Sequence, residues 1–283
     1  MRYDRFEYDY TNRAPEVGVA SSKDNYDNWS PKIGANYNFN RSSGLYVNYS
    51  QGFKPPQVST LYRNRNELKD IKPSVYDNYE IGGYFNLNKK WKIDGAIYLL
   101  NGKNTLITLR DENDAFFNTN AGETNSYGIE YGITYSPIPA LSFTHNGSYA
   151  KHRYDVFFDD GVDLSDTDRE IAPNLLGISL ITYRPFKDFS ITAEHELVGE
   201  YNTSFENQVV NDDGTTGTAT YDGHNIFNLR ATYRYKNIEL WGHLLNVFDD
   251  LYASRVSYNS FSDSNSFTIG NPRAFHLGMR LHL

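Results

Sequence analysis

Histidines and carboxylates are the side chains of this sequence that could perform acid–base or metal chemistry. The nearest approach to a catalytic group is Glu194-His195-Glu196, but in an extended strand His195 shares its face with Ile191 and Leu197, which makes it a poor general base. The sequence contains no cysteine, so it has neither a thiolate ligand nor a cysteine nucleophile. We expect no metal site, no cofactor and no enzymatic activity. The seven histidines lie far apart, at His145, His152, His195, His224, His243, His276 and His282.

Two polar stretches carry aromatic rings beside groups that could hold an anionic, aromatic ligand. An arginine next to aromatic residues could contact such a ligand through its charge and through cation–π attraction. The first group is Tyr62, Arg63 and Arg65, with Lys69 and Lys72, and the second is Phe116 and Phe117, with Asn118 and Asn120. The simpler interpretations are a solvated loop for the first group and packing against a neighbouring loop for the second.

A third stretch is acidic and could attract divalent cations. Its spacing does not match an EF-hand, and Gly161 stands at the wrong position for one. A solvated acidic loop is therefore the simpler interpretation. The acidic residues are Asp155, Asp159, Asp160, Asp163, Asp166, Asp168 and Glu170.

The elements that must position these residues show a period of two from end to end. In the stretch 32–40, Ile33, Ala35, Tyr37 and Phe39 alternate with polar residues or glycine. Successive side chains of a β-strand point to opposite faces, so each such stretch predicts a strand with one apolar and one polar face. We predict about twelve strands, at 2–10, 30–40, 43–54, 77–88, 90–101, 125–136, 140–150, 173–184, 188–202, 225–236, 237–248 and 272–283.

The connections between these strands alternate between short turns and long polar loops, with long loops near 11–29, 55–76, 102–124, 151–172, 203–224 and 249–271. Strands of this length, joined in this way, are typical of an antiparallel transmembrane β-barrel. Aromatic residues gather near the short turns, as in the aromatic belt of a membrane protein. A soluble sheet of twelve long strands would instead leave a large apolar surface in water.

The polar face carries charges that would be costly against lipid and therefore point into the barrel. Among them are Glu194 and Glu196 on one predicted strand and Arg230 and Arg234 on another. They could contact a domain inside the barrel or simply solvate its wall.

Composition excludes other classes. The 283 residues carry a net charge of −8 and contain no Lys/Arg block, which argues against nucleic-acid binding. The longest apolar run, near Ala96 to Leu100, is far too short for a transmembrane helix. An aromatic content of 16% argues against a disordered chain.

Five segments resemble motifs of the TonB-dependent outer-membrane receptors, in the order of that family. In the fourth, Val247 replaces the usual leucine, and the chain ends in Leu283 where most members end in an aromatic residue. The opening Arg2-Tyr3-Asp4-Arg5 extends the resemblance to nearly the whole chain. The five segments are Tyr49 to Pro56, Leu68 to Pro73 with Tyr79 to Gly82, Asn120 to Glu123 with Gly128 to Glu130, Asn246 to Tyr252, and Asn271 to Phe275.

The resemblance implies that residues 1–283 are the C-terminal half of a 22-stranded barrel without its plug domain or TonB box. It implies a place in the outer membrane of a Gram-negative bacterium and a receptor that takes up a large, scarce nutrient, foremost a ferric siderophore. Haem, cobalamin and glycans stay open as cargo. The implied partners are outer-membrane lipid, lipopolysaccharide, TonB and the inner-membrane energising complex. The alternatives are a self-contained twelve-stranded passive channel and, less favoured, a barrel enzyme.

Overall fold

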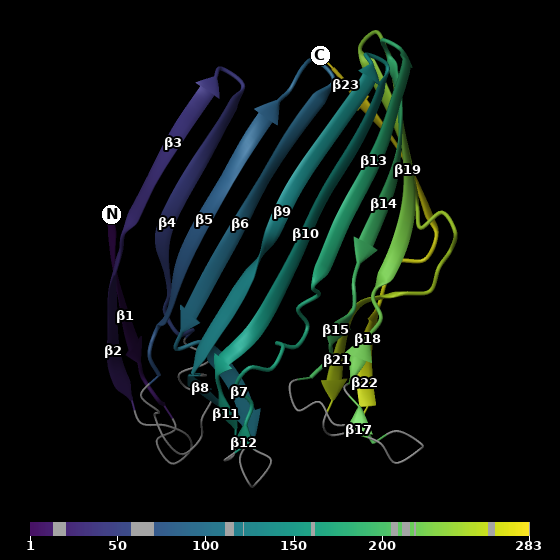
Figure 1. Cartoon of the computed structure of the whole chain (residues 1–283). Coiled ribbons are helices and arrows are strands. Elements are labelled where there is room, and N and C mark those ends of the chain that lie inside the picture. The colour runs from purple at the N-terminus through teal and green to yellow at the C-terminus, as the bar shows by residue number, and fades with distance from the viewer. Residues whose placement is uncertain are drawn as a thin grey trace.

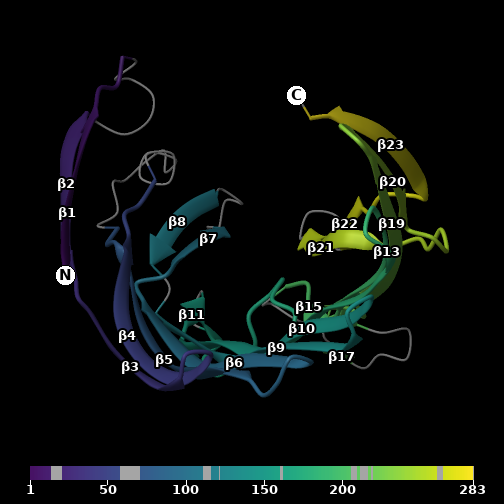
Figure 2. The same ribbon diagram turned by 90° about the horizontal axis from the view of Figure 1, so that it is seen from above.

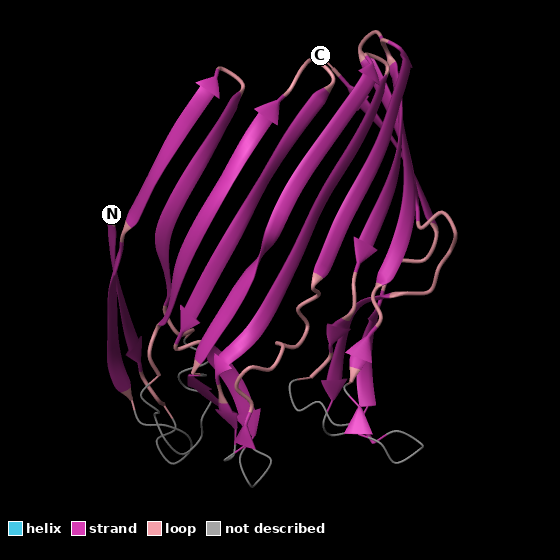
Figure 3. Ribbon diagram, in the orientation of Figure 1, coloured by secondary structure: helices cyan, strands magenta, loops and turns pink. Residues whose placement is uncertain are grey.

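The computed structural model describes residues 1–13, 21–57, 71–110, 116–120, 122–159, 162–204, 209–210, 216–217, 219–259 and 264–282. These residues form strands, turns and loops, as the colouring by secondary structure shows (Figure 3). No helix among them is long and apolar enough to cross a bilayer. The predicted all-β class is confirmed.

Eleven strands form one antiparallel sheet that curves into an open wall (Figures 1 and 2). Each strand pairs with the one that precedes or follows it among these eleven, so the sheet is an up-and-down meander. The strands are β3 (Lys32–Asn40), β4 (Ser43–Lys54), β5 (Ser74–Asn86), β6 (Trp91–Lys103), β9 (Glu123–Ile138), β10 (Leu141–Val156), β13 (Leu175–Phe186), β14 (Phe189–Val198), β19 (His224–Tyr235), β20 (Ile238–Leu245) and β23 (Ala274–Leu281).

These eleven strands correspond to eleven of the twelve predicted ones, with ends displaced by a few residues. The prediction for 188–202 ran too far, because β14 ends at Val198 and Tyr201–Asn202 belongs to a separate two-stranded sheet. The predicted strand 2–10 exists as β1 (Arg2–Tyr10), but it pairs with β2 (Ser22–Ser30) outside the large sheet. The prediction of a loop over 11–29 was wrong at its second half, which is β2.

Strands β2 and β3 follow one another with only Pro31 between them. Proline has no backbone N–H to donate, so a regular ladder breaks at this residue. The Pro31 carbonyl still accepts a hydrogen bond of 3.0 Å from the backbone N–H of Gln51. The hairpin β1–β2 therefore adjoins the large sheet without sharing its register.

The long connections carry further small hairpins at the end of the wall opposite the short turns (Figure 1). The prediction of a long polar loop near 102–124 was incomplete, because two strands lie within it. The hairpin strands are β7 (Leu106–Arg110) with β8 (Phe116–Asn120), β11 (Phe158–Asp159) with β12 (Val162–Asp163), β15 (Tyr201–Asn202) with β18 (Thr220–Tyr221), β16 (Val209–Val210) with β17 (Thr216–Gly217), and β21 (Ala253–Asn259) with β22 (Ser264–Ile269).

The convex face of the wall is apolar and exposed. Ile33 and Leu277, near opposite edges of the sheet, are each 71% exposed, and many other large apolar side chains lie on the same face. A contiguous apolar surface of this size needs a non-aqueous environment or a partner. The period-two prediction of one apolar and one polar face therefore describes the observed sheet.

Aromatic side chains form a belt on this convex face beside the short turns. The rings of Trp91 and Tyr135 stack with centroids 4.2 Å apart, and Phe186 lies 5.5 Å from Phe189. Amphipathic rings at this level are typical of the boundary between lipid and water. We call this group the aromatic belt; its members are Tyr37, Phe39, Phe85, Trp91, Tyr135, Phe143, Tyr183, Phe186, Phe189, Tyr233 and Tyr235.

Candidate ligand-facing surface

The concave face of the wall holds an open pocket of about 770 Å³. Its lining comes from strands β4 to β19 and includes Tyr46, Tyr131, Leu176, Ile178 and Val198 beside many polar residues. Five carboxylates line the pocket, against one cationic side chain, Arg230. A hollow surface with this excess of negative charge attracts cationic groups. The carboxylates are Glu80, Asp94, Glu130, Glu194 and Glu196.

Glu194 is the most deeply held of these carboxylates, with 6% of its side chain exposed. Its Oε1 accepts a hydrogen bond of 2.9 Å from the Asn228 amide and one of 2.8 Å from the Arg230 guanidinium. A buried carboxylate needs such charge-assisted donors to offset its lost hydration. Arg230 is half exposed and borders the pocket, so one part of its guanidinium stays open to the hollow.

Glu80 is held on the other side of the pocket. The Tyr46 hydroxyl donates a hydrogen bond of 2.6 Å to Glu80 Oε1. The Tyr46 ring lies across Gly82, where an added Cβ would stand only 2.5 Å from the tyrosine oxygen. Glycine at position 82 is thus required by the close approach of Tyr46, and the pair Tyr46–Glu80 depends on it.

A second charged cluster lies at the short-turn end of the wall. Glu239, 13% exposed, has the Arg234 guanidinium at 2.7 Å, the Arg280 guanidinium at 3.4 Å and the His282 Nε2 at 3.7 Å. Two arginines around one carboxylate leave a net positive charge there. Arg234 therefore belongs to this cluster and does not reach the pocket that Arg230 lines.

Two hairpins at the other end, β7–β8 and β21–β22, lie inside the curve of the wall (Figure 2). Asn120 anchors the first. Its Nδ2 donates to the Lys72 carbonyl at 2.9 Å and to the Asn104 carbonyl at 2.7 Å, and its Oδ1 accepts from the Lys72 backbone N–H at 2.8 Å. The hairpin is therefore held over the hollow face by side-chain hydrogen bonds, and Asn120 and the Lys72 backbone are occupied by them.

The second inward hairpin packs against its neighbouring loop through a small buried core. The Tyr201 hydroxyl accepts a 2.8 Å hydrogen bond from the backbone N–H of Val256, which is fully buried. The Tyr221 hydroxyl donates to the Ala253 carbonyl at 3.0 Å. Burial lowers the pKa of His224, which lies beside Tyr221 and Tyr252. These contacts fix the hairpin β21–β22 to the segment that follows β14.

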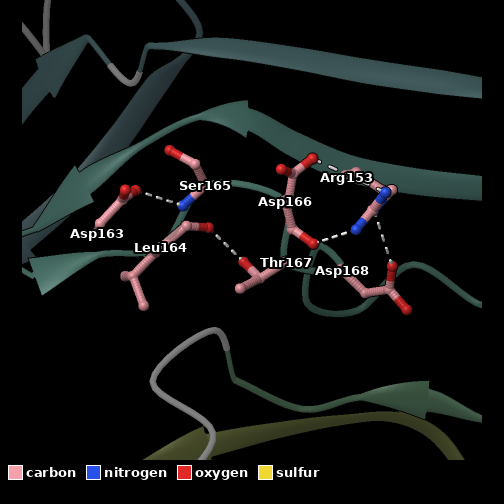
Figure 4. A network of polar contacts seen from close by, with 7 residues as sticks. All are labelled: Arg153, Asp163, Leu164, Ser165, Asp166, Thr167 and Asp168. Carbon is pink, nitrogen blue, oxygen red and sulfur yellow. Dashed lines mark hydrogen bonds and ion pairs between the residues drawn. The ribbon is translucent and has the colours of Figure 1, made fainter.

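The acidic stretch folds back on its own strand and satisfies several of its charges internally (Figure 4). Arg153 lies 3.9 Å from Asp166 and 3.7 Å from Asp168, and its guanidinium also donates to the Asp166 carbonyl. Asp163 Oδ1 accepts a 3.0 Å hydrogen bond from the Ser165 backbone N–H. Hydrogen bonding to Ser165, first to its side chain and then to its backbone, lowers the pKa of this carboxyl. The described part of the stretch is a loop closed by its own side chains.

Beneath this loop lies a buried polar group at the outer end of β10. The Tyr154 hydroxyl, buried with its ring, donates to Glu170 at 2.8 Å, and Arg169 lies over the Tyr154 ring at 5.8 Å. His152 Nδ1 lies 2.9 Å from the Ser126 hydroxyl. Burial, and then the nearby Arg169, lower the pKa of His152, so this histidine is held neutral.

Only some of the predicted site residues lie within the described part of the structure. Glu194, Glu196 and Arg230 line one pocket, as their shared strand face predicts. Phe116 and Phe117 belong to strand β8. Tyr62, Arg63, Arg65 and Lys69, and the side chains of Phe116 and Phe117, lie outside the described residues.

His195 lies on the convex face, as its parity predicts. Its ring stacks on Phe227 at 4.5 Å, and its Nε2 lies 2.9 Å from Asn225 Oδ1. The described residues contain no group of three or more His, Cys, Asp or Glu side chains that could hold a metal ion.

Sequence reasoning missed three side chains that hold the charged clusters together: Tyr46, Asn228 and Glu239. Asn228 could have been found, because it shares strand parity with Arg230 and faces Glu194 across the ladder. Tyr46 and Glu239 needed the register between neighbouring strands, which a single sequence does not give.

One motif turns out to be structural. Asn246, 2% exposed, directly follows β20 and has a positive φ of 48°, a conformation that asparagine tolerates. Its amide donates to the carbonyls of Asp250 and Asn271, and its Oδ1 accepts from the Asp250 backbone N–H at 2.9 Å. Asp249 accepts from the Arg273 backbone N–H at 2.8 Å. The motif thus closes one turn and fixes the start of β23.

Comparison with protein families gives one match, to the model described as TonB dependent receptor-like, beta-barrel, over residues 1–268. Comparison with curated proteins by sequence finds no relative.

Solved structures with this architecture are numerous. The siderophore receptor PiuA from Acinetobacter baumannii superimposes with a TM-score of 0.73 at 16% identity, covering 98% of this chain and 39% of that one. The ferric yersiniabactin uptake receptor FyuA from Yersinia pestis gives 0.70 at 16%, covering 92% and 38%. The ferric-catecholate import receptor Fiu from E. coli K12 gives 0.68 at 20%, covering 99% and 41%. At these identities the likeness shows the fold, and the chain spans about two fifths of each relative's length.

Proposed function

Because the chain belongs to the TonB-dependent receptor-like β-barrel family, we propose that it forms part of the wall of an outer-membrane receptor for energy-coupled uptake of a large nutrient. The observation that carries this proposal is the two-faced wall: an exposed apolar convex face and a charged concave face with a pocket of about 770 Å³. In a bilayer the apolar convex face would contact lipid chains, while the charged concave face would contact water. The proposal places the chain in the outer membrane of a Gram-negative bacterium.

Within this proposal the wall works together with other parts of the receptor. TonB and the inner-membrane complex would supply the energy through a domain that fills the hollow. The matched structures are more than twice as long as the stretch that this chain covers, which supports a role as one part of a larger barrel. Residues 1–283 alone are then expected to give no energy-dependent uptake. Appreciable uptake by a strain that carries only these residues would contradict the proposal.

We propose a ferric siderophore as the cargo. The support is indirect: several similar structures are named as siderophore or iron receptors, although one is a copper transporter. Tyr62, Arg63 and Arg65, with Phe116 and Phe117, stay the candidate contacts for an anionic aromatic chelate.

The cargo is tested by titrating the complete receptor with ferric catecholate, ferric citrate, haem and Cu²⁺ while following tryptophan fluorescence. Saturable quenching by a ferric chelate supports the proposal. The double variant Arg63→Ala/Arg65→Ala should bind that chelate with lower affinity. The matched control is Lys54→Ala, at the outer end of β4. A response to haem or Cu²⁺ alone would remove the siderophore assignment.

The passive-channel alternative fits the sheet less well. Among the described residues the wall is open, with β3 and β23 at its two edges. Eleven alternating strands leave these two edges running in the same direction, so their direct pairing would be parallel. Membrane barrels of this kind close through antiparallel pairs. A barrel enzyme has still less support, because His195 lies against Phe227 on the apolar face.

A further inference from the structure

The charge of the chain is divided unevenly along the strands. Within two residues of the short-turn strand ends there are nine Lys and Arg and two Asp and Glu, a net charge of +7. The remaining residues hold 18 Lys and Arg against 33 Asp and Glu, a net charge of −15. We call the nine cations the basic collar; they are Arg41, Lys89, Lys90, Lys92, Arg184, Lys187, Arg234, Lys236 and Arg280.

The collar is exposed and largely without compensating charge. All nine residues belong to the exposed class. Within the described part of the chain, Arg234 and Arg280 are the only collar residues that form ion pairs, both with Glu239. At the turn that carries Lys89 and Lys90, the Asn88 side chain accepts the backbone N–H groups of Lys90 and Trp91 at 2.7 and 3.1 Å. These two backbone N–H groups are thus satisfied within the turn, and both lysine side chains are exposed.

The collar also lies at the level of the aromatic belt. Lys90 is followed directly by Trp91, and Lys187 stands between Phe186 and Phe189. The Lys236 ammonium lies 5.4 Å from the centroid of the Tyr235 ring, which is an outward belt residue. Aromatic belts mark the depth of lipid head groups, so the turn lysines Lys89, Lys90, Lys187 and Lys236 stand where lipid phosphates lie. Lys92, Arg234 and Arg280 lie on the strand face that points into the barrel and add to the positive charge at this level.

We propose that the basic collar binds the phosphates of anionic phospholipids in the leaflet next to the short turns. This rests on the membrane placement in the proposed function. A basic residue near an anionic membrane surface strengthens binding by about fivefold, and the attraction falls with ionic strength. The excess of acidic residues elsewhere in the chain gives the opposite end no such preference.

The test is native mass spectrometry of the full chain in a non-ionic detergent, with dioleoyl phosphatidylglycerol or dioleoyl phosphatidylcholine added. The collar variant is Lys89→Gln/Lys90→Gln/Lys187→Gln/Lys236→Gln. A matched variant removes four lysines at the other end, Lys54→Gln/Lys72→Gln/Lys103→Gln/Lys151→Gln. A third replaces the four collar lysines by arginine. Circular dichroism checks that each variant keeps its strand content.

We expect the unaltered chain to prefer phosphatidylglycerol and the collar variant to lose this binding by at least about tenfold. The matched and arginine variants should keep it, and added salt should weaken it. Equal binding of the two lipids, or an equal loss of phosphatidylglycerol binding in the collar and matched variants, would contradict phospholipid binding by the basic collar. Either result leaves the membrane placement intact. Binding of an acidic periplasmic protein without any lipid preference also contradicts phospholipid binding by the collar. If the chain takes up neither lipid and is monodisperse in detergent-free buffer, the membrane placement falls as well.

Discussion

Arg230 reaches Glu194 diagonally across the ladder between β14 and β19. Glu194 stands directly opposite Asn228, and Arg230 stands opposite Thr192, yet the guanidinium lies 2.8 Å from the Glu194 carboxylate. The carboxylate thus receives one donor from straight across and one from the next residue of the same face. This arrangement ties two strands of the wall together at the edge of the concave pocket.

Removing Arg230 should therefore destabilise the wall through Glu194. Arg230→Ala leaves a nearly buried carboxylate with Asn228 as its remaining donor, and we expect a loss of about 1–3 kcal/mol. The double variant Arg230→Ala/Glu194→Gln should recover most of this loss, because no unpaired charge remains. Urea unfolding in detergent micelles measures both. The control is Glu196→Gln on the same face, which should change stability little.

Gly82 should tolerate a side chain only when Tyr46 is shortened. A Cβ at position 82 would stand 2.5 Å from the tyrosine oxygen and 2.6 Å from the ring carbon that bears it. Gly82→Ala alone should cost about 1–3 kcal/mol, because Tyr46 must turn away from Glu80. In a Tyr46→Ala background the same change should cost little. Additive effects of the two changes in a double-mutant cycle would contradict the proposed contact.

Asn246 should be replaceable by neither alanine nor aspartate. Asn246→Ala removes two donors and one acceptor from a buried turn and places alanine at a positive φ, so we expect a loss of about 2–4 kcal/mol. Asn246→Asp keeps the acceptor for the Asp250 N–H, but its carboxylate has no proton to donate to the carbonyls of Asp250 and Asn271. Thermal unfolding ranks the variants. Asp250→Ala is the control, since only the backbone of Asp250 takes part.

The convex and concave faces should respond oppositely to charge. Ile97→Lys places a charge on the exposed apolar face, where a lysine at mid-bilayer costs about 2–4 kcal/mol. Ala96→Lys, one residue earlier, faces Glu130 across the ladder and lines the pocket. We expect it to be tolerated. Folding yields of the two variants in lipid vesicles compare them directly, and equal yields would argue against lipid contact at position 97.

Acid should loosen the outer loop that covers His152. Its pKa is lowered from the ordinary value of 6.5, so protonation favours the opened loop. The stabilisation by neutral His152 is complete above the ordinary value and is lost as the pH falls from there through the lowered pKa. The protection factors of residues 151–159 and 162–174, in which the exchange rates are corrected for the intrinsic pH dependence of amide exchange, should therefore fall between neutral pH and pH about 5. His152→Gln should remove most of this pH dependence of the protection factors.

The sequence alone predicted the wall well, because alternation decides which face of a strand is buried. A one-residue slip in β9 would turn Ile129 to the concave face and Glu130 to the apolar face. The apolar pattern therefore strongly restricts the register that the strand can adopt. Strand β2 was missed for the opposite reason. It is rich in Asp and Asn, which have low strand propensity, and its apolar residues Tyr26 and Trp29 do not alternate cleanly. Its pairing with β1 decides its conformation.

The candidate site was predictable only where strand parity suffices. Glu194, Glu196 and Arg230 share one strand parity and line one pocket, whereas Arg234, of the same parity, lies at the short-turn end. Their role as contacts to a ligand or to an inner domain stays a prediction. The partnership of Tyr46 with Glu80 joins residues 34 apart in sequence, and that of Glu239 with Arg280 joins residues 41 apart. The order of the strands follows from the predicted antiparallel barrel, but contacts of this range depend on the residue register between the paired strands. The folding of the acidic stretch back to Arg153 depends on turns that composition does not reveal.

Pro31 separates two parts of the chain that should tolerate insertions and deletions differently. The eleven wall strands share one sheet, in which an inserted or deleted residue within a strand would exchange the two faces for the rest of that strand. The hairpin β1–β2 belongs to a different ladder that stops at the proline. Its length and composition can drift, or be replaced by a grafted hairpin, without transmitting a shift into the neighbouring strands. The hairpin β1–β2 is thus a segment where residues for a new ligand could be introduced with little effect on the stability of the large sheet.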